Sequence, residues 1–380
     1  MLRVLHVSPS YARKDGGPSE VLRGLLPALD SLGIEQTVIT TDKGANASDS
    51  DFLHQHRVVA YRARPPYSWT FSPTMALGIF SGVRAADIVH IHSIHTFTST
   101  LAMFACRWLK TPYLLEPHGA LDKYHMDQGR VKKKRYMKFI DRGNIKHLSG
   151  IIYSSKRESD HGFLEMPKTP SHVVPLGVHK SLFEIIRQDA ANRSFEILFL
   201  GRVTEKKHLD LVITALATEP LLSTDCRVTV AGPIDSALTY DPIKLVKDLG
   251  VSDRVTFLGQ VDANARQDLL SRASVYVLPS EDESFGVAVA ESLAAGCPTV
   301  ASANVGIAPD GAAAGALRFA PMSATALSEM LGDLLCDAKQ LQDLGRTGRA
   351  YAASNFTWVN SATRFHGVYS EVLAAKPKRN

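Results

Sequence analysis

Two glutamates, Glu283 and Glu291, lie eight positions apart on either side of a predicted loop-to-helix junction. The loop follows the apolar run 275–278, which is typical of a buried parallel strand. The backbone N–H groups of Ser284, Phe285 and Gly286 would lie at the N-terminus of the helix, where its dipole favours an anion. Carboxylates that bind sugar hydroxyls, beside amides that bind phosphate, would suit a sugar nucleotide. A surface loop with solvated acids and a helix cap is an equally supported alternative.

Two cations follow another strand-like run, at residues 195–200. Arg202 comes directly after this strand, and Lys207 comes five residues later at the start of a predicted helix. An arginine can bind a diphosphate through paired hydrogen bonds, and a lysine can bind it as a point charge. Lys206 precedes Lys207, so the sequence leaves open which of the two lysines makes this contact. Positive charge at a helix start opposes the dipole, which makes a merely solvated surface the weaker explanation.

Glycines and a histidine follow strands in the first half of the chain. Gly16 and Gly17 come after the strand 4–8 and allow positive φ angles and close approach of a ligand to the backbone. His118 follows the strand 113–116, at the end of a strand where open α/β sheets bind ligands. We therefore predict a functional role for His118, with a structural histidine as the alternative.

Two other patterns have residue types that bind metal ions. His90 and His92 share one face of a predicted strand, and His95 falls in the loop beyond it. No acidic residue is expected in register with them, so hydrogen bonding at the strand end is favoured over a metal site. Asp49 and Asp51 form an Asp-x-Asp pair in a loop rich in polar residues, for which a solvated loop is the favoured interpretation.

Strands and helices alternate along the chain and must position these residues, which indicates an α/β fold with parallel sheets. The alternation restarts near residue 195. We therefore predict an N-terminal domain over residues 1–190 and a C-terminal domain over residues 191–357, with the polar segment 189–194 as the linker. The remaining sequence predicts a series of helices, over 323–336, 339–354 and 360–375.

Residues 130–147 form a basic segment with interleaved apolar residues. Its cations are Arg130, Lys132, Lys133, Lys134, Arg135, Lys138, Arg142 and Lys146. Tyr136 and Ile140 would share one helical face, so the pattern predicts a basic amphipathic helix that can rest on an anionic membrane surface or meet a phosphorylated acceptor. A solvated cationic face is equally supported. Nucleic acid is not an expected partner, because no recognised binding module accompanies the segment.

The composition is that of a globular protein large enough for two domains. The chain has 380 residues, of which 45% are hydrophobic and 21% charged, with a net charge of +5. No apolar run approaches the roughly 20 residues that a membrane helix needs, and the apolar stretch at the N-terminus is too short for a signal peptide. The four cysteines show no CxxC spacing and are interpreted as core residues in a reducing compartment, so a cytoplasmic location is expected.

The combination of Gly16-Gly17, Pro117-His118-Gly119, Gly201-Arg202 with Lys207, and Glu283-x7-Glu291 resembles the family-4 retaining glycosyltransferases of GT-B fold. The resemblance extends from the first strand to the tryptophan before the final helix, and it rests on the order and spacing of the motifs. It implies two Rossmann-like domains with parallel sheets facing a deep interdomain cleft. It also implies that a C-terminal helix, 358–380, completes the N-terminal domain. The N-terminal domain would then meet the acceptor, and the C-terminal domain would hold a nucleotide-sugar donor.

The resemblance assigns roles to the donor-side residues. Arg202 and Lys207 would hold the donor diphosphate and stabilise the charge of the leaving group. Glu283 would accept hydrogen bonds from the donor sugar, and Glu291 from the ribose. The amides of residues 284–286 would complete the anion site.

On the acceptor side, Gly16 and Gly17 would let the loop approach the phosphate or the acceptor. His118 would stabilise the oxocarbenium-like transition state. The family needs no divalent metal for its chemistry, so no cofactor is expected, and it retains configuration through front-face attack without a protein nucleophile. Two positions depart from the family pattern: His208 stands where glycine often follows the phosphate lysine, and residues 305–310 replace a Gly-Gly-x-Pro-Glu run.

The expected reaction is transfer of a hexosyl group from a UDP- or GDP-sugar to a saccharide or a polyprenyl-linked saccharide, in the assembly of cell-surface polysaccharide. The enzyme would then act in the cytoplasm or at the inner face of the membrane. A non-hydrolysing sugar-nucleotide epimerase and a non-catalytic sugar-nucleotide binder are the alternatives. The complete set of Arg202, Lys207, Glu283 and Glu291 argues against the non-catalytic one.

Overall fold

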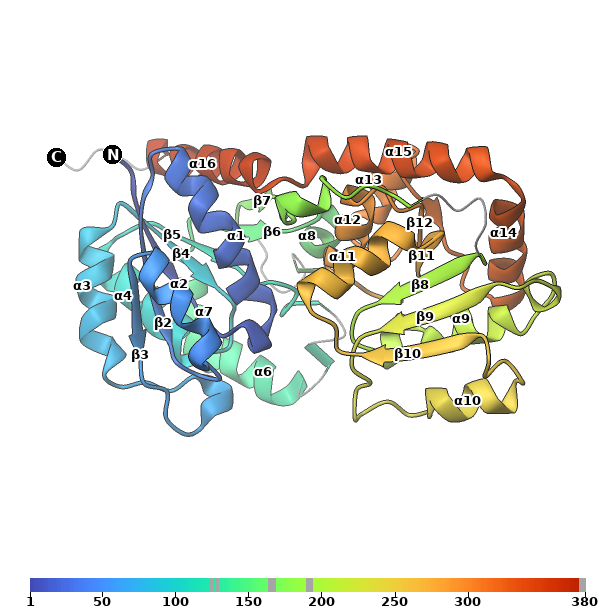
Figure 1. The fold of residues 1–380 in the computed structure, drawn as a ribbon. Helices are drawn as coiled ribbons and strands as arrows, with labels where there is room; N and C mark the ends of the chain where they lie inside the picture. Colours follow the sequence, from blue (N-terminus) through green and yellow to red (C-terminus); the bar gives the residue numbers. More distant parts are fainter. Residues whose placement is uncertain (123–125, 128–129, 163–168, 189–193, 376–380) are drawn as a thin grey trace. The chain divides into compact units, whose positions relative to one another are not determined.

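The computed structural model describes residues 1–122, 126–127, 130–162, 169–188 and 194–375. They form two compact units, one made of Met1–Gly177 with the segment from Trp358 onward, and the other of Val178–Thr357. Each unit is a parallel β-sheet with helices packed on it (Figure 1). The predicted α/β fold with two parallel-sheet domains is therefore confirmed.

The sheet of the first unit has seven strands in the order β3-β2-β1-β4-β5-β6-β7, and every neighbouring pair is parallel. The strands are β1 (Arg3–Val7), β2 (Glu35–Thr41), β3 (Val58–Tyr61), β4 (Ile88–His92), β5 (Tyr113–Glu116), β6 (Gly150–Tyr153) and β7 (Ser171–Val173). All residues of β4, β5 and β6 are buried. Burial on both faces explains why these strands appear in the sequence as almost continuous apolar runs.

The helices of the first unit cover the two faces of this sheet. They are α1 (Gly17–Ser31), α2 (Ser50–Gln55), α3 (Met75–Ala85), α4 (Phe97–Leu109), α6 (Arg130–Tyr136), α7 (Arg142–Ile145), α8 (Lys156–Gly162) and α16 (Trp358–Ala374). On one face, α1 and α16 pack together and bury Leu25, Phe365 and Tyr369 against the strands. On the other face, α3 and α4 bury Ile79 and Met103.

The sheet of the second unit has six strands in the order β10-β9-β8-β11-β12-β13, again all parallel. The strands are β8 (Glu196–Leu200), β9 (Arg227–Ala231), β10 (Val255–Gly259), β11 (Val275–Leu278), β12 (Thr299–Ala301) and β13 (Arg318–Phe319). The helices are α9 (Leu209–Leu216), α10 (Pro242–Asp248), α11 (Ala263–Arg272), α12 (Val287–Ala294), α13 (Ala308–Ala313), α14 (Ala324–Cys336) and α15 (Ala338–Asn355).

In both sheets, the later strands are added on either side of the first strand in the sequence. The strand order reverses between β1 and β4 in the first unit and between β8 and β11 in the second. In open α/β sheets the crevice outside the carboxyl ends of the strands, at this reversal, is where ligands bind. The fold therefore offers one such position in each unit.

The boundary between the units differs from the predicted one at residue 190. Residues 178–188 belong to the second unit, because their backbone is held there: Ile185 O accepts a hydrogen bond from Arg349 (2.6 Å), and Gln188 N donates to Ser271 O (3.1 Å). The composition of the sequence predicts a polar linker, whereas the chain passes from one unit to the other after Gly177. The predicted linker lies outside the described residues except for Ser194.

Candidate active site

The predicted cations and Glu283 follow the two strands that flank the reversal in the second unit. Gly201 and Arg202 come directly after β8, and Glu283 lies in the loop after β11. Because β8 and β11 are neighbours, their carboxyl ends present these loops side by side. The structure therefore places these residues after the strands that the sequence predicted them to follow, and it shows that the two strands are neighbours.

Lys207 and Glu283 form a partly buried charge cluster. Lys207 ends the short 3₁₀ helix η6 (Glu205–Lys207), and its Nζ lies 3.4 Å from Glu283 Oε1. Lys206 Nζ lies 3.8 Å from the same oxygen. These side chains are only 15–17% exposed, and together they carry one more positive charge than negative. The cluster therefore has the charge and the protection from water that an anion site needs.

Glycine at position 201 makes room for this cluster. A Cβ there would lie 2.9 Å from Lys207 Nζ, and φ is +132°. Gly232, the residue after β9, has even less room for a side chain, because a Cβ there would lie 2.0 Å from Gly201 O. The two glycines therefore let the ends of β8 and β9 approach each other beneath the lysine.

Arg202 points elsewhere in this structure. Its side chain is 64% exposed, and its guanidinium lies 3.6 Å from Asp235 Oδ2. An ion pair this exposed contributes little to stability and is easily exchanged for another anion. The structure thus brings Lys207 and Glu283 together, and leaves Arg202 at the rim.

The loop 283–286 is held by backbone hydrogen bonds to the loop 304–307. Glu283 N donates to Asn304 O (3.2 Å), and Ile307 N donates to Phe285 O (3.1 Å). Gly286 has φ +95°, and a Cβ there would lie 2.3 Å from Val305 Cγ1, so no other residue fits without displacing this pair of loops. The helix α12 begins at Val287. Ser284, Phe285 and Gly286 therefore precede the first turn, while the Phe285 ring is buried against Phe356.

Glu291 has a partner that the sequence did not reveal. In the second turn of α12, its Oε1 accepts a hydrogen bond from Arg266 on α11 (2.7 Å). The Glu291 side chain is only 13% exposed. A ribose hydroxyl would therefore meet a carboxylate that is already oriented by an arginine.

In the first unit, Gly16 and Gly17 form the entry to α1. Their φ angles are +63° and +28°, in the region that favours glycine. A Cβ at either position would meet no atom within 4 Å. The backbone turn, rather than crowding, therefore explains these glycines, and the space above them is open within this unit.

His118 lies in the turn two residues after β5, with a positive φ of +52°, and its ring turns inward. Its Nε2 lies 3.0 Å from His92 Nδ1, and its Nδ1 lies 3.6 Å from Glu116 Oε1. The side chain is 6% exposed. The next residue, Gly119, donates its N–H to the buried Glu158 (2.6 Å). Both ring nitrogens of His118 therefore face buried groups in this structure.

His6, His90, His92 and Glu116 form a buried cluster behind His118. The expectation that no acidic residue lies in register with the histidines is wrong, because Glu116 pairs with His92 across β4 and β5. The register of neighbouring parallel strands is a long-range property, so β4 alone could not reveal it. Burial lowers the pKa of His90 to about 3 and lowers those of His6 and His92, while it raises the pKa of Glu116.

The second pattern considered for a metal, Asp49 with Asp51, is not a solvated loop. Asp49 is fully buried and accepts hydrogen bonds from Arg13 N (3.0 Å) and Arg23 (3.1 Å), whereas Asp51 is exposed. The buried carboxylate ties the loop before α1 to η2 (Ala47–Asp49). Its role is therefore structural.

Two family models match the sequence one after the other. The Glycosyl transferase 4-like domain matches residues 16–177, and Glycosyl transferases group 1 matches residues 183–351. The chain belongs to the group 1 glycosyltransferases. This confirms the family expected from the sequence motifs, and shows that the protein is an enzyme of the transferase class.

Curated relatives and solved structures agree with this assignment. The glycosyltransferase is 33% identical to D-inositol 3-phosphate glycosyltransferase of Salinispora tropica over 50% of this chain and 40% of that protein. It is 25% identical to GDP-mannose:cellobiosyl-diphosphopolyprenol alpha-mannosyltransferase of Komagataeibacter xylinus, over 100% and 96% of the two chains. The structure of Anabaena HepE in complex with UDP and glucose matches with a TM-score of 0.75 at 17% identity, over 98% and 100% of the chains. That likeness shows the GT-B fold.

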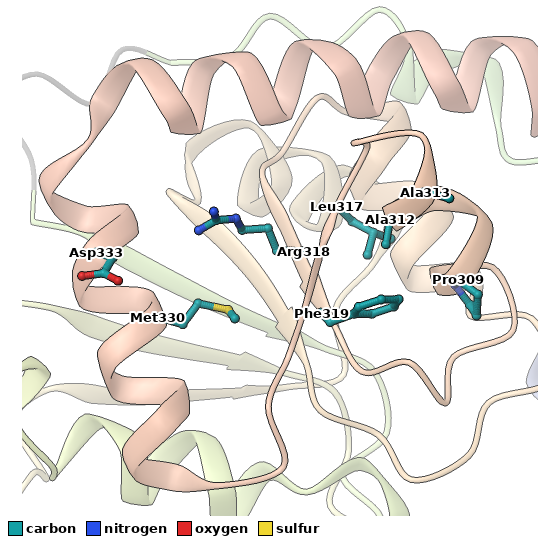
Figure 2. A pocket seen from close by; sticks show the side chains of 8 residues that line it. All are labelled: Pro309, Ala312, Ala313, Leu317, Arg318, Phe319, Met330 and Asp333. Atoms are coloured by element: carbon teal, nitrogen blue, oxygen red, sulfur yellow. The ribbon is translucent and has the colours of Figure 1, made fainter.

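The glycosyltransferase also has a hollow of about 660 Å³ at the β13 edge of its second unit (Figure 2). Figure 2 shows Pro309 and two alanines of α13 at one end, and Met330 and Asp333 of α14 at the other, with Phe319 between them. None of the predicted site residues lines it. The hollow is therefore separate from the Lys207–Glu283 cluster.

His208, which follows Lys207, departs from the family pattern. His208 has φ +51°, in the left-handed region that favours glycine. This backbone angle explains why glycine is common at this position in the family. Here the imidazole lies 3.2 Å from Glu281 and 3.4 Å from Asp210. Contacts with two acidic side chains thus accompany the unfavourable backbone angle.

None of the helices in the described ranges is both long and apolar enough to span a membrane.

Proposed function

We propose that this enzyme is a retaining glycosyltransferase that moves a hexosyl group from a nucleotide-diphosphate sugar, a UDP- or GDP-sugar, to a saccharide or lipid-linked saccharide. The observation that carries the proposal is the Lys207–Glu283 pair at the ends of β8 and β11. It joins a cation suited to a diphosphate and a carboxylate suited to sugar hydroxyls within one partly buried site. A binding site for a nucleoside alone would not need this carboxylate.

Each side chain has a distinct role in this proposal. Lys207 binds the donor diphosphate and stabilises the charge that develops on it as the glycosidic bond breaks. Arg202, whose exposed ion pair is easily exchanged, turns to the same diphosphate. Glu283 accepts hydrogen bonds from the sugar. Glu291, oriented by Arg266, accepts them from the ribose.

The cationic side chains make a resident metal unnecessary in this proposal, and the leaving phosphate itself takes the proton of the acceptor hydroxyl. Retention of configuration then follows from attack on the face from which the leaving group departs. Activity that persists in the presence of EDTA, with the transferred sugar in the α configuration from an α-linked donor, would support both points. Loss of activity that Mg²⁺ or Mn²⁺ restores would contradict the first.

A lipid-linked acceptor in cell-surface polysaccharide synthesis is supported by relatives and by charge. The mannosyltransferase of Komagataeibacter xylinus is named for a diphosphopolyprenol acceptor. In the basic segment, Val131, Phe139 and Ile140 are exposed beside exposed lysines such as Lys132 and Lys138. Apolar and basic side chains on one exposed segment suit an anionic membrane surface.

The local structure of this segment differs from the expected single helix. A π-helical turn, η4 (Met137–Asp141), interrupts α6 and α7. Tyr136 turns inward, where its hydroxyl hydrogen-bonds Trp69 and Thr100 (both 2.8 Å), whereas Ile140 is exposed. The wider turn therefore separates two residues that were expected on one face.

The donor is tested by ligand-induced stabilisation and by transfer. Thermal unfolding is measured with UDP-, GDP- and ADP-sugars, and the stabilising donor is then used with polyprenyl-linked and free saccharides. Lys207→Ala and Glu283→Ala should each lower kcat/KM by about 10²-fold or more, because each removes a charged contact to the donor. Lys247→Ala and Glu329→Ala, at exposed positions on α10 and α14, are the controls. Turnover like that of the wild type in both site variants would contradict the assignment, and donor epimerisation without acceptor would replace it.

Binding to membranes is tested separately by sedimentation with vesicles that contain anionic lipid. Binding at low salt that weakens as salt is added is the expected result. Lys132→Glu with Lys138→Glu should reduce it, with Lys244→Glu and Lys247→Glu together, at exposed positions on α10, as the control with the same change of charge. Absence of binding at low salt would remove this part of the proposal.

A further inference from the structure

The turn that carries His118 has a backbone conformation that must be held in place. His118 has φ +52° and Gly119 has φ +76°, so two consecutive residues lie in the left-handed region. Glycine adopts this region readily, whereas a residue with a side chain does so at a cost in free energy. Such a conformation persists only where the surrounding structure over-determines it. The turn therefore needs contacts that fix its backbone.

Glu158, on α8, supplies a contact of this kind. Its Oε1 accepts a hydrogen bond from Gly119 N at 2.6 Å. Its Oε2 accepts hydrogen bonds from Ser154 N (2.7 Å) and from Ser154 Oγ (2.6 Å), at the residue directly after β6. Glu158 is only 1% exposed. The buried carboxylate therefore joins the loop after β5 to the loop after β6.

The other backbone hydrogen bonds of the turn leave the N–H of Gly119 for Glu158. Ala120 N donates to Pro117 O (3.1 Å), and Asp122 N donates to Gly119 O (3.1 Å). These two bonds are local, because each joins residues at most three positions apart in the chain. Glu158 is thus the support that reaches the turn from a separate element.

Helix capping is the competing explanation for Glu158. Ser155 Oγ accepts a hydrogen bond from Glu158 N (3.1 Å), which is half of a capping box at the start of α8. In a complete capping box the carboxylate would accept from the N–H of Ser155. Here Oε2 bonds to the preceding residue, Ser154, and Oε1 bonds to Gly119, 39 positions earlier in the chain. Capping therefore accounts for one oxygen at most, and not for the contact with Gly119.

We propose that Glu158 is a positioning residue that holds the turn at His118 and Gly119 in its left-handed conformation, and thereby orients the ring of His118. The direction in which a side chain points depends on the φ and ψ angles of its own residue. In the observed conformation, His118 Nε2 lies 3.0 Å from His92 Nδ1. A turn released from Glu158 would relax away from the left-handed region and carry the ring away from His92.

The consequence for the reaction is the one step that rests on the proposed function. The family resemblance implies that His118 acts on the transition state, and misplacement of an active-site group by about 1 Å can lower a rate about 10²-fold. The donor is proposed to bind Lys207 and Glu283, which are not in contact with Glu158. Loss of the Glu158 contact should therefore lower kcat about tenfold or more, with little change in the KM for the donor.

Glu158→Gln separates positioning from capping. Glutamine serves in a capping box as glutamate does, but its amide has one acceptor oxygen and one NH₂ donor. It cannot accept from both Ser154 and Gly119, because its NH₂ group would face one of their N–H groups. The variant should therefore keep α8 and lose the contact with Gly119. Ser154→Ala is the control, because it removes one hydroxyl bond to Oε2 and leaves Gly119 N bound.

The Gly119 amide can be observed alone by NMR. Labelling with ¹³C-carbonyl histidine and ¹⁵N-glycine gives correlated signals only for glycines that follow a histidine, which are Gly119, Gly162 and Gly367. His161→Gln and His366→Gln each remove one of the other two signals and so assign all three. In the wild type, Gly119 should be shifted downfield and exchange slowly with solvent, because it donates a short hydrogen bond to a buried carboxylate.

The variants should affect this signal differently. Glu158→Gln should move the Gly119 signal upfield and raise its exchange rate about tenfold or more. The Gly367 signal, from α16, should stay in place. Ser154→Ala should leave the Gly119 signal and kcat close to those of the wild type. Circular dichroism gives the folded fraction of each variant, to which kcat is normalised.

Three results would overturn the proposal. They are a wild-type Gly119 amide that is neither shifted nor protected, a Glu158→Gln protein with an unchanged Gly119 signal, and a changed signal with an unchanged kcat. The wild-type measurement needs no variant to fold. Should Glu158→Gln not fold, Glu158→Asp, which keeps the charge on a side chain one methylene shorter, is measured in the same way. A wild type that shows the expected amide but transfers no sugar would contradict the proposed function and leave the contact between Glu158 and Gly119 standing.

Discussion

Two glycines in helices that pack together should respond to the same substitution with opposite signs. Gly24 in α1 faces the indole of Trp358, the first residue of α16, and a Cβ at Gly24 would lie 2.0 Å from its Cε2 and 2.2 Å from its Nε1. Gly177 confines the other end of the ring, since a Cβ there would lie 2.5 Å from Cδ2. Gly367, within α16 itself, would place a Cβ in open space. Only the surroundings distinguish the two sites, because both glycines are helical.

The magnitudes follow from two terms. Gly→Ala inside a helix stabilises it by about 1 kcal/mol, because alanine loses less conformational freedom. At Gly367 this term acts alone, and we expect a gain of about 0.5–1 kcal/mol. At Gly24 the indole must move by more than an ångström to reach ordinary contact, and overpacking of this kind costs about 1–3 kcal/mol. A displacement this large corresponds to the upper part of that range, about 2–3 kcal/mol, so after the helical gain of about 1 kcal/mol the net loss at Gly24 should be about 1–2 kcal/mol.

Urea denaturation followed by circular dichroism measures both changes. For a domain of this size the loss at Gly24 corresponds to a decrease of about 2–8 °C in melting temperature. Trp358→Leu provides the test of cause, because in that background Gly24→Ala should lose most of its effect. A Gly24→Ala protein that is stabilised as much as Gly367→Ala would refute the reasoning, as would a loss that persists without the indole.

Three further substitutions or treatments test other parts of the structure. Burial raises the pKa of Asp141 to about 6, so the folded state binds this proton more tightly than the unfolded state. The free energy of unfolding should therefore fall by about 2–3 kcal/mol as pH rises from about 4 to above 6. Asp141→Asn should abolish that fall, which urea titrations at the two pH values would measure. Gly232→Ala would place a Cβ 2.0 Å from Gly201 O at φ +149°, and it should both destabilise the second unit by about 1–3 kcal/mol and weaken donor binding, measured by calorimetry. Cys336 is exposed and the other three cysteines are buried, so a thiol reagent should label one cysteine in the native protein and four after unfolding.

The sequence was most informative where a property is local. Buried parallel strands appear as short apolar runs, so β8 and β11 and the positions of Arg202 and Glu283 after them could be predicted. The glycine at 286 was expected at a helix start, and its positive φ is of the kind that such positions require. These features depend on neighbours in the chain.

The partners of the site residues could not be predicted in the same way. Arg266 binds Glu291 from another helix, and Glu116 meets His92 because two strands align in a particular register. The inward turn of the His118 ring depends on the second of these contacts, because His118 lies 3.0 Å from His92. The sequence contained one signal of this cluster. Ionisable residues occur within predicted buried strands, and one of them is a glutamate in the otherwise apolar run 113–116.

The return of the chain to its first unit affects how the protein is made. The chain leaves that unit after Gly177 and re-enters it at Trp358, and there Phe365 and Tyr369 complete a core that includes Val4 and Ile88. On the ribosome, the whole second unit is therefore synthesised before α16 emerges. Domains usually fold in the order of their synthesis, but here the unit with the earlier residues is completed last. Until then the part of the core that α16 covers is exposed beside α1, and we expect the nascent chain to present this apolar surface to chaperones at a defined stage of translation.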